Sequence, residues 1–298
     1  MALLGFLQEE PLSEIELPPA TAVVAYGLAM CVLSVLLLRR FAGGWLQSSL
    51  PQEESLPGPW NTAHLVIVVL LGVMLQILAG SLVAIFARSR GVEIAELSAG
   101  VALLAAAFWQ GALVVVLVLV ARKSPRGFAS LGLSSTRPRA ILVGMGMYLV
   151  ALPALFGSSL LWSQVLEFMG RGGETQAVQE MILRTVGAEV PLAVALAVVV
   201  VPFLEEVIFR GWLQGWISHR LSPVHGIVIP AALFALMHGA AVLLPIFVLA
   251  LLLGVVRQRT ERLAPVFAMH ALHNGIQIFF LLYFQPDVTA ASLLSFLP

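Results

Sequence analysis

Charged residues are scarce in this chain. Only 11% of its 298 residues are Asp, Glu, Lys or Arg, whereas 60% are apolar, and the mean hydropathy is +0.99. A soluble domain carries about 25% charged residues, so the composition excludes an ordinary soluble fold and predicts a polytopic membrane protein. The formal net charge is zero, which gives no indication of a nucleic-acid partner.

Cysteine and aspartate are almost absent, and each absence excludes a kind of site. Cys31 is the single cysteine, so the chain cannot form an internal disulfide and lacks the cysteine spacing of a metal site. Asp287 is the single aspartate and lies outside the long apolar runs, which excludes a pair of catalytic aspartates. The chain also contains no H-E-x-x-H zinc motif and no G-x-S-G serine motif.

Long apolar runs are what the sequence has in abundance, and roughly 20 residues suffice to cross a bilayer. The run from Gly226 to Val256 is too long for one simple span, and Gly239 and Pro245 interrupt it, so we predict two short helices there. The fold class predicted is all-α, with about eight transmembrane helices. The predicted spans are Pro19–Leu38, Leu65–Phe86, Leu97–Ala121, Ala140–Trp162, Pro191–Phe209 with a continuation to about Arg220, the two helices within Gly226–Val256, and Pro265–Phe284.

Basic residues follow alternate predicted spans. By the positive-inside rule the loops that hold them are cytoplasmic, which places both termini outside. The arginine-rich, nearly lysine-free composition suggests a bacterial inner membrane. The eleven residues on this side are Arg39, Arg40, Arg122, Lys123, Arg126, Arg137, Arg139, Arg220, Arg257, Arg259 and Arg262.

Three charges interrupt the apolar stretch VVVVPFLEEVIFRGW, residues 198–212. A charged side chain in mid-membrane costs about 2.5–3.5 kcal/mol on insertion scales, and such residues are candidates for function. On a helix, Glu206 and Arg210 are four residues apart and can form an ion pair. Glu205 faces about 100° away and is not the natural partner of Arg210. Pro202 removes a backbone donor and can kink the helix.

Two further groups place histidines in apolar runs. Phe234-x-x-x-His238 and His270-x-x-x-Asn274 each put two side chains on one helical face, and His273 is three residues after His270. At about 1.5 Å per residue from the cytoplasmic turns, Glu205 lies at a depth of roughly 22 Å, His238 at roughly 24 Å and His270 at roughly 12 Å. The three groups can therefore meet in one cavity within the membrane.

A carboxylate and a histidine around a water molecule form a hydrolytic site. Glu205, not committed to Arg210, could act as general base, and His238 could share the water or bind a metal. His270 and Asn274 could donate hydrogen bonds to an oxyanion. Glu205, His238 and His270 are also an acceptable ligand set for a catalytic zinc. The sequence does not decide between a metal-free and a metal-assisted reaction.

The three groups, EEVIFR, FALMH and HALHN, in this order resemble the motifs of the CPBP family of intramembrane proteases. That family includes the CAAX prenyl endopeptidases and bacterial Abi or bacteriocin-immunity-like proteins. The resemblance covers roughly residues 125–284, including the loop FASLGLSS. We therefore expect residues 1–122 to be helices of unassigned role, residues 123–285 to be the protease core, and residues 286–298 to be a tail.

The resemblance implies an all-helical core whose site opens toward the cytoplasm or the bilayer. Glu205 would activate water with His238 as its partner, Glu206 and Arg210 would hold the site together, and His270 and Asn274 would stabilise the oxyanion. A divalent metal such as zinc would be a cofactor only in the metal-dependent form. The metal-free form is favoured because Arg210 would repel a cation. The expected partner is a membrane-embedded or lipid-anchored peptide, prenylated or not.

Two other functions stay open at this stage. A non-catalytic immunity or scaffold protein could use the same polar network to hold helices or bind a peptide. A proton-coupled transporter could use buried Glu and His as a relay, but it predicts inverted repeats, and the sequence contains none. Residues 163–189, a polar segment, could connect two spans along the outer surface or cap a cavity.

Overall fold

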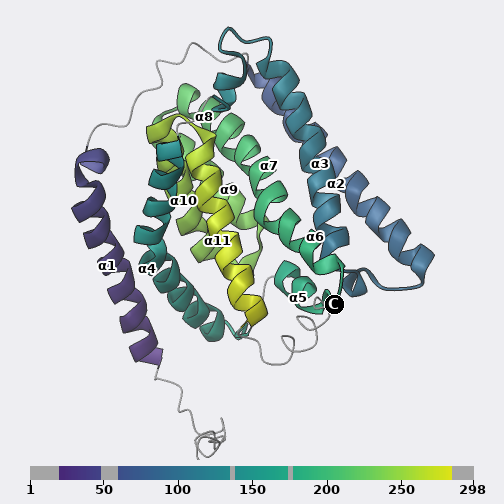
Figure 1. Ribbon diagram of the computed structural model, residues 1–298, viewed down its shortest axis with the longest axis horizontal. Coiled ribbons are helices and arrows are strands. Elements are labelled where there is room, and N and C mark those ends of the chain that lie inside the picture. The colour runs from purple at the N-terminus through teal and green to yellow at the C-terminus, as the bar shows by residue number, and fades with distance from the viewer. Residues whose placement is uncertain (1–19, 48–59, 135–137, 174–176, 284–298) are drawn as a thin grey trace, which may run out of the picture.

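The computed structural model describes residues 20–47, 60–134, 138–173 and 177–283, and within these ranges the chain is helical without strands (Figure 1). Seven helices are long and apolar enough to cross a membrane, and an eighth apolar helix, Pro223–Met237, is shorter. The predicted all-α fold with about eight spans is therefore confirmed. Pro19, Phe284 and the predicted tail 286–298 lie outside the described residues.

Eleven α-helices follow one another along the described chain, and two of the junctions are π-helical. Residues 189–220 form one continuous helix made of α6, η4, α7, η5 and α8, as predicted for the span that begins at Pro191. The bounds are α1 Ala20–Gln47, α2 Thr62–Arg90, η2 Ile94–Glu96, α3 Ala99–Ala121, η3 Gly127–Leu131, α4 Pro138–Phe168, α5 Ala177–Arg184, α6 Glu189–Ala195, η4 Leu196–Val200, α7 Val201–Glu206, η5 Val207–Leu213, α8 Gln214–Arg220, α9 Pro223–Met237, η6 Ala240–Val242, α10 Leu243–Thr260 and α11 Leu263–Tyr283.

The continuous helix α6–α8 occupies the middle of the bundle (Figure 1). Helix α3 packs along it on one side together with α2, and α11 packs against it on the other. Helix α4 contacts α10 and α11, and α1 lies on the outer side of α4. The connections α3–α4, α8–α9 and α10–α11 share one end of the molecule (Figure 1), so the fold groups most of the basic loops as the sequence predicts.

The break between α9 and α10 occurs at Gly239. This residue has φ of +90°, a conformation that glycine adopts at no steric cost and other residues rarely adopt. The predicted split at Gly239 is confirmed. Pro245 does not interrupt the second helix, because it lies in the first turn of α10, where a backbone N–H has no helical partner. The result is one short helix, α9, and one of full spanning length.

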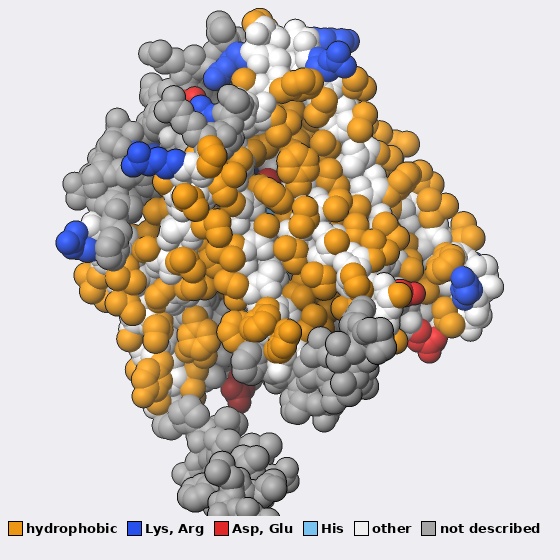
Figure 2. Space-filling model, in the orientation of Figure 1, with side chains coloured by type: hydrophobic (Ala, Val, Ile, Leu, Met, Phe, Trp, Pro, Cys, Tyr) orange, Lys and Arg blue, Asp and Glu red, His pale blue; other side chains and the backbone are white. Residues whose placement is uncertain are grey.

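The outer surface of the bundle is apolar over its middle. Helix α2 exposes a row of large apolar side chains, including Ile67, Leu70, Met74 and Ile77. Figure 2 shows hydrophobic side chains over most of the visible face, with Lys, Arg, Asp and Glu toward its margins. Such a band matches the hydrocarbon layer of a bilayer, and the described helices thus identify an integral membrane protein.

Two helical stretches fall within the described part of residues 163–189. The first six residues continue α4 to Phe168, and α5 then packs across α3 and α11. Ile182 of α5 is buried with Leu103 of α3 and Ile278 of α11. The hydroxyl of Thr185 accepts a hydrogen bond of 3.1 Å from Ala99 N–H. Helix α5 thus packs against both α3 and α11, and whether the segment caps a cavity stays a prediction.

Candidate active site

The two glutamates lie in α7, a six-residue α-helical piece between two π-helical segments. In η4, Val201 N–H donates to Leu196 O, five residues back. The next acceptor, Ala197 O, would need the N–H of residue 202, which is proline and has none. Pro202 therefore cannot give Ala197 O the hydrogen bond that Val201 gives to Leu196 O. Insertions of this kind are frequent at functional sites.

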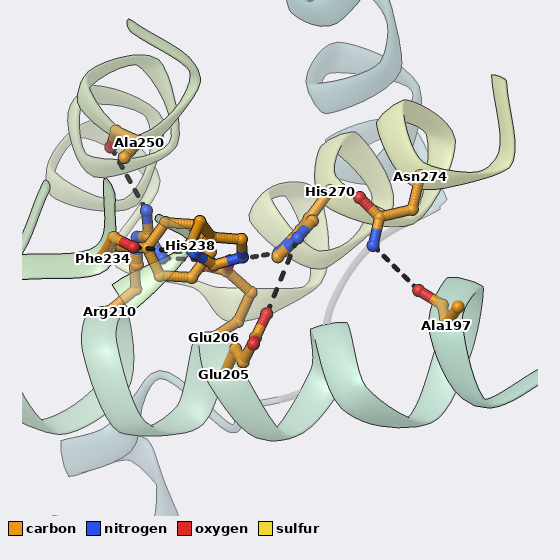
Figure 3. Close-up of polar contacts among 9 residues, drawn as sticks. All are labelled: Ala197, Glu205, Glu206, Arg210, Phe234, His238, Ala250, His270 and Asn274. Atoms are coloured by element: carbon orange, nitrogen blue, oxygen red, sulfur yellow. Dashed lines mark hydrogen bonds and ion pairs between the residues drawn. The ribbon is translucent and has the colours of Figure 1, made fainter. Parts of the chain in front are cut away.

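Asn274 of α11 satisfies this carbonyl. Its Nδ2 donates a hydrogen bond of 2.8 Å to Ala197 O (Figure 3). A side-chain amide nitrogen has two N–H groups, so one remains for another acceptor. The role of Asn274 as an oxyanion donor stays a prediction, and the structure adds a second role, because this bond ties α11 to the helix that holds the glutamates.

Glu206, Arg210 and His270 form a buried network (Figure 3). Arg210 Nη1 donates to Glu206 Oε1 at 3.2 Å, and His270 Nδ1 lies 2.7 Å from the same oxygen. Since an ionised carboxylate only accepts, the proton in the second bond belongs to His270 Nδ1. The three side chains are at most 3% exposed. The predicted ion pair of Glu206 with Arg210 is present, and His270 extends it.

Arg210 has two further contacts that hold its guanidinium in place. Its Nη2 donates to Ala250 O of α10 at 3.4 Å, and its Cζ lies 4.5 Å from the centroid of the Phe234 ring. An arginine over an aromatic face gains electrostatic attraction in addition to its ion pair. Arg210 therefore links α9 and α10 to the carboxylate pair.

Glu205 lies apart from the ion pair and is the more accessible carboxylate. Its side chain is 13% exposed, and Oε2 lies 3.8 Å from His270 Nε2. This distance is too long for a hydrogen bond but within the range of an ion pair when His270 is protonated, and Figure 3 marks the contact. Because Nδ1 of His270 is engaged with Glu206, Nε2 is the ring nitrogen that points to Glu205. The prediction that Glu205 is not committed to Arg210 agrees with this geometry.

The ring of Phe234 packs against both motif histidines, His238 and His270. Its ring centroid lies 4.3 Å from that of His238 and 5.7 Å from that of His270. His238 Nδ1 donates to Phe234 O at 2.7 Å, since a carbonyl oxygen only accepts. Nε2 of a neutral His238 is then left as an acceptor. The partnership of His238 with Glu205 stays a prediction, because the contacts described for His238 are with Phe234.

Tyr148 was not among the residues that the sequence predicted for the site. Its hydroxyl lies 3.1 Å from His273 Nδ1, and both side chains are buried. His273 thus points to α4, whereas His270 on the same helix points to α7. Two features of the sequence could have indicated the pair. A tyrosine stands in the apolar run of α4, and His273 follows the motif histidine His270 by three residues on α11. This pair fixes the rotation of α11 and does not join the glutamates.

Glu205, His238 and His270 are also the predicted ligands if the reaction uses a metal. Among the described residues, no group of three or more His, Cys, Asp or Glu side chains is arranged to hold a metal ion. Nδ1 of each histidine is already hydrogen-bonded, to Phe234 O and to Glu206. Nε2 of each ring is left as the nitrogen that could bind a metal, since a metal-ligating histidine ordinarily donates its other ring N–H to a carbonyl or carboxylate, and metal dependence stays a prediction that a chelator tests.

The fold and the site together define a class of protein, namely an integral membrane protein with carboxylates and histidines buried between its spans. Residues 187–276 match the model of the type II CAAX prenyl endopeptidase Rce1-like family. This stretch includes all three motifs, so the predicted resemblance to the CPBP family is confirmed. The match supports an intramembrane endopeptidase of the CAAX type, acting on a membrane-associated peptide. Comparison with curated proteins and with solved structures gave no match.

Proposed function

We propose that the chain hydrolyses a peptide bond of a membrane-associated substrate with a water molecule activated by Glu205. The observation that carries the proposal is the difference in contacts and exposure between two adjacent carboxylates, Glu205 and Glu206. Glu206 is occupied by Arg210 and His270, while Glu205 is partly exposed and faces His270 Nε2 across 3.8 Å. One carboxylate is therefore structural, and the other is available for proton transfer.

In the proposed reaction, Glu205 removes a proton from water as the oxygen attacks the carbonyl carbon of the substrate. The tetrahedral oxyanion is stabilised by the second N–H of Asn274 and by Nε2–H of His270 in its imidazolium form. Glu205 then gives its proton to the leaving nitrogen, and the C–N bond breaks to give a carboxylate and an amine. His238, with Nδ1 fixed by Phe234, offers Nε2 as an acceptor for the same water.

The substrate class follows from the family match and from the apolar surroundings of the site. A CAAX-type substrate carries its peptide at the membrane on a lipid anchor, and an unprenylated membrane peptide would also reach the site. A metal remains an alternative means of activating the water, and the chain's own residues would still perform the proton transfers.

The experiment is cleavage of a fluorogenic farnesylated CAAX peptide by protein purified in detergent, with Glu205→Gln as the test variant. We expect a loss of about 10²–10⁴ in kcat, the range attributed to general acid–base groups. Glu167→Gln, an exposed glutamate at the end of α4, is the matched control and should be as active as wild type. A folded Glu205→Gln protein with full activity would refute the proposal.

Two further arms of this experiment separate the alternatives. A chelator that abolishes cleavage, with recovery on adding zinc, would identify a metal-dependent reaction. An immunity or scaffold protein predicts the opposite of the main result, namely no cleavage by wild type and peptide binding that survives in Glu205→Gln.

A further inference from the structure

Gln110 in the middle of α3 is a polar side chain without an explanation in the site described above. It is 5% exposed, and its Oε1 is buried without a hydrogen-bond partner among the residues that the structure describes. A buried amide that lacks partners costs free energy unless a ligand supplies them. Helix α3 lies outside the stretch matched by the family model.

The position of Gln110 on α3 is central to the buried face. Leu103 is seven residues before it, Val114 is four residues after it and Leu117 is seven residues after it, so all four side chains share one face. The three apolar residues are buried. Gln110 is therefore directed inward and away from lipid, which is where a polar group on a spanning helix serves a site.

The packing of α3 against α6–α8 places Gln110 at the level of the glutamates. Leu103 packs in a cluster with Leu196 of η4 and Val201, the first residue of α7. Leu117 packs in a cluster with Val207 and Phe209, after α7. Gln110 lies midway between Leu103 and Leu117 in the sequence, and Glu205 and Glu206 lie between Val201 and Val207.

The contact between Gly111 and Leu204 shows more closely which part of α7 lies beside Gln110. A Cβ added to it would lie 3.9 Å from Leu204 Cδ1. Leu204 immediately precedes Glu205, and Gln110 immediately precedes Gly111. The two helices thus bring the Gln110 amide, whose Oε1 is unpartnered, to the height of the proposed general base.

From these observations we infer that Gln110 binds the backbone of the substrate peptide beside the bond to be cleaved. This inference rests on the proposed function. A peptide can be hydrolysed in the membrane only where its backbone is not satisfied by its own helix, and backbone donors and acceptors in hydrocarbon need partners. A glutamine amide offers one acceptor and two donors, the set that an extended peptide requires. In this reading, α3 supplies one wall of the substrate site, and α5 covers its end.

The test is the kinetics of Gln110→Met, which keeps the shape of the side chain and removes its hydrogen bonds. We expect KM for the farnesylated peptide to rise about 3- to 10-fold, the effect of one or two net hydrogen bonds, with kcat nearly unchanged. The melting temperature should stay equal or rise, because the variant no longer buries an unsatisfied amide. Gln277→Met, an exposed glutamine of α11, is the matched control and should leave KM unchanged.

A methylated peptide identifies the contact directly. Methylation of the amide nitrogen next to the scissile bond should weaken binding to wild type and have little further effect on Gln110→Met, because the pair would no longer exist. Wild-type KM in Gln110→Met, or a melting temperature several degrees lower, would overturn the assignment while leaving the protease proposal intact. Absence of both cleavage and peptide binding in wild type would overturn both proposals.

Discussion

Removing Arg210 tests whether the buried ion pair is structural. Arg210 and Glu206 are 1% and 0% exposed, with 3.2 Å between Nη1 and Oε1. The substitution Arg210→Met leaves the Glu206 carboxylate buried with His270 as its remaining partner. Deleting one member of a buried pair costs about 3–5 kcal/mol, because the other charge is no longer compensated. We expect the free energy of unfolding to fall by about this amount.

The assay is thermal unfolding in detergent, followed by the fluorescence of the six tryptophans. At about 2 °C per kcal/mol for a chain of this size, the apparent melting temperature of Arg210→Met should drop by about 6–10 °C. Arg88→Met makes the same chemical change at an exposed position of α2. Its effect should be within about 0.5 kcal/mol of zero, as for most surface substitutions.

The double variant Glu206→Gln with Arg210→Met separates charge compensation from packing. It removes both charges and keeps an oxygen that accepts from His270 Nδ1, so it should be more stable than Arg210→Met alone. If the double variant melts at or below the temperature of Arg210→Met, the reasoning from an uncompensated carboxylate is wrong, and the guanidinium acts chiefly through Phe234 and Ala250.

The remaining predictions concern two further hydrogen bonds of α11. Asn274→Ala should remove the side-chain donor to Ala197 O, which costs about 1–3 kcal/mol, and should also lower kcat. Thermal unfolding measures the loss of stability, and peptide cleavage measures the change in kcat. An unchanged melting temperature would contradict the expected loss of stability. Tyr148→Phe removes the hydroxyl from His273 and should reduce stability by about 1 kcal/mol without abolishing cleavage; total loss of activity would show that Tyr148 belongs to the reaction itself.

Local patterns explain the parts of the structure that were predicted. The spans follow from the length and composition of apolar runs, since every spanning backbone must satisfy its own hydrogen bonds. The pair Glu206–Arg210 follows from helical periodicity, because residues four apart share a face whatever surrounds them. The break at Gly239 follows from a residue that alone adopts φ of +90° freely. Each of these depends on neighbours in the sequence.

Contacts between helices were predicted less completely. His270 was expected at the oxyanion, and the structure joins its Nδ1 to Glu206. Two π segments flank α7, and each extra residue in a helical turn rotates the following side chains relative to an ideal α-helix. Which carboxylate meets which histidine therefore depends on a local register that the motif spacing does not contain.

The sequence by itself determined that this is an all-helical membrane protein with three polar motifs within its apolar spans, because hydropathy and helical spacing are properties of short segments. Only the tertiary structure decided that Glu206 contacts both Arg210 and His270 while Glu205 is partly exposed, that Asn274 donates to Ala197 O, and that Gln110 of α3 lies level with the glutamates. The physical reason is that the relations between helices join residues from 64 to 96 positions apart in the chain, and the packing of whole helices sets them.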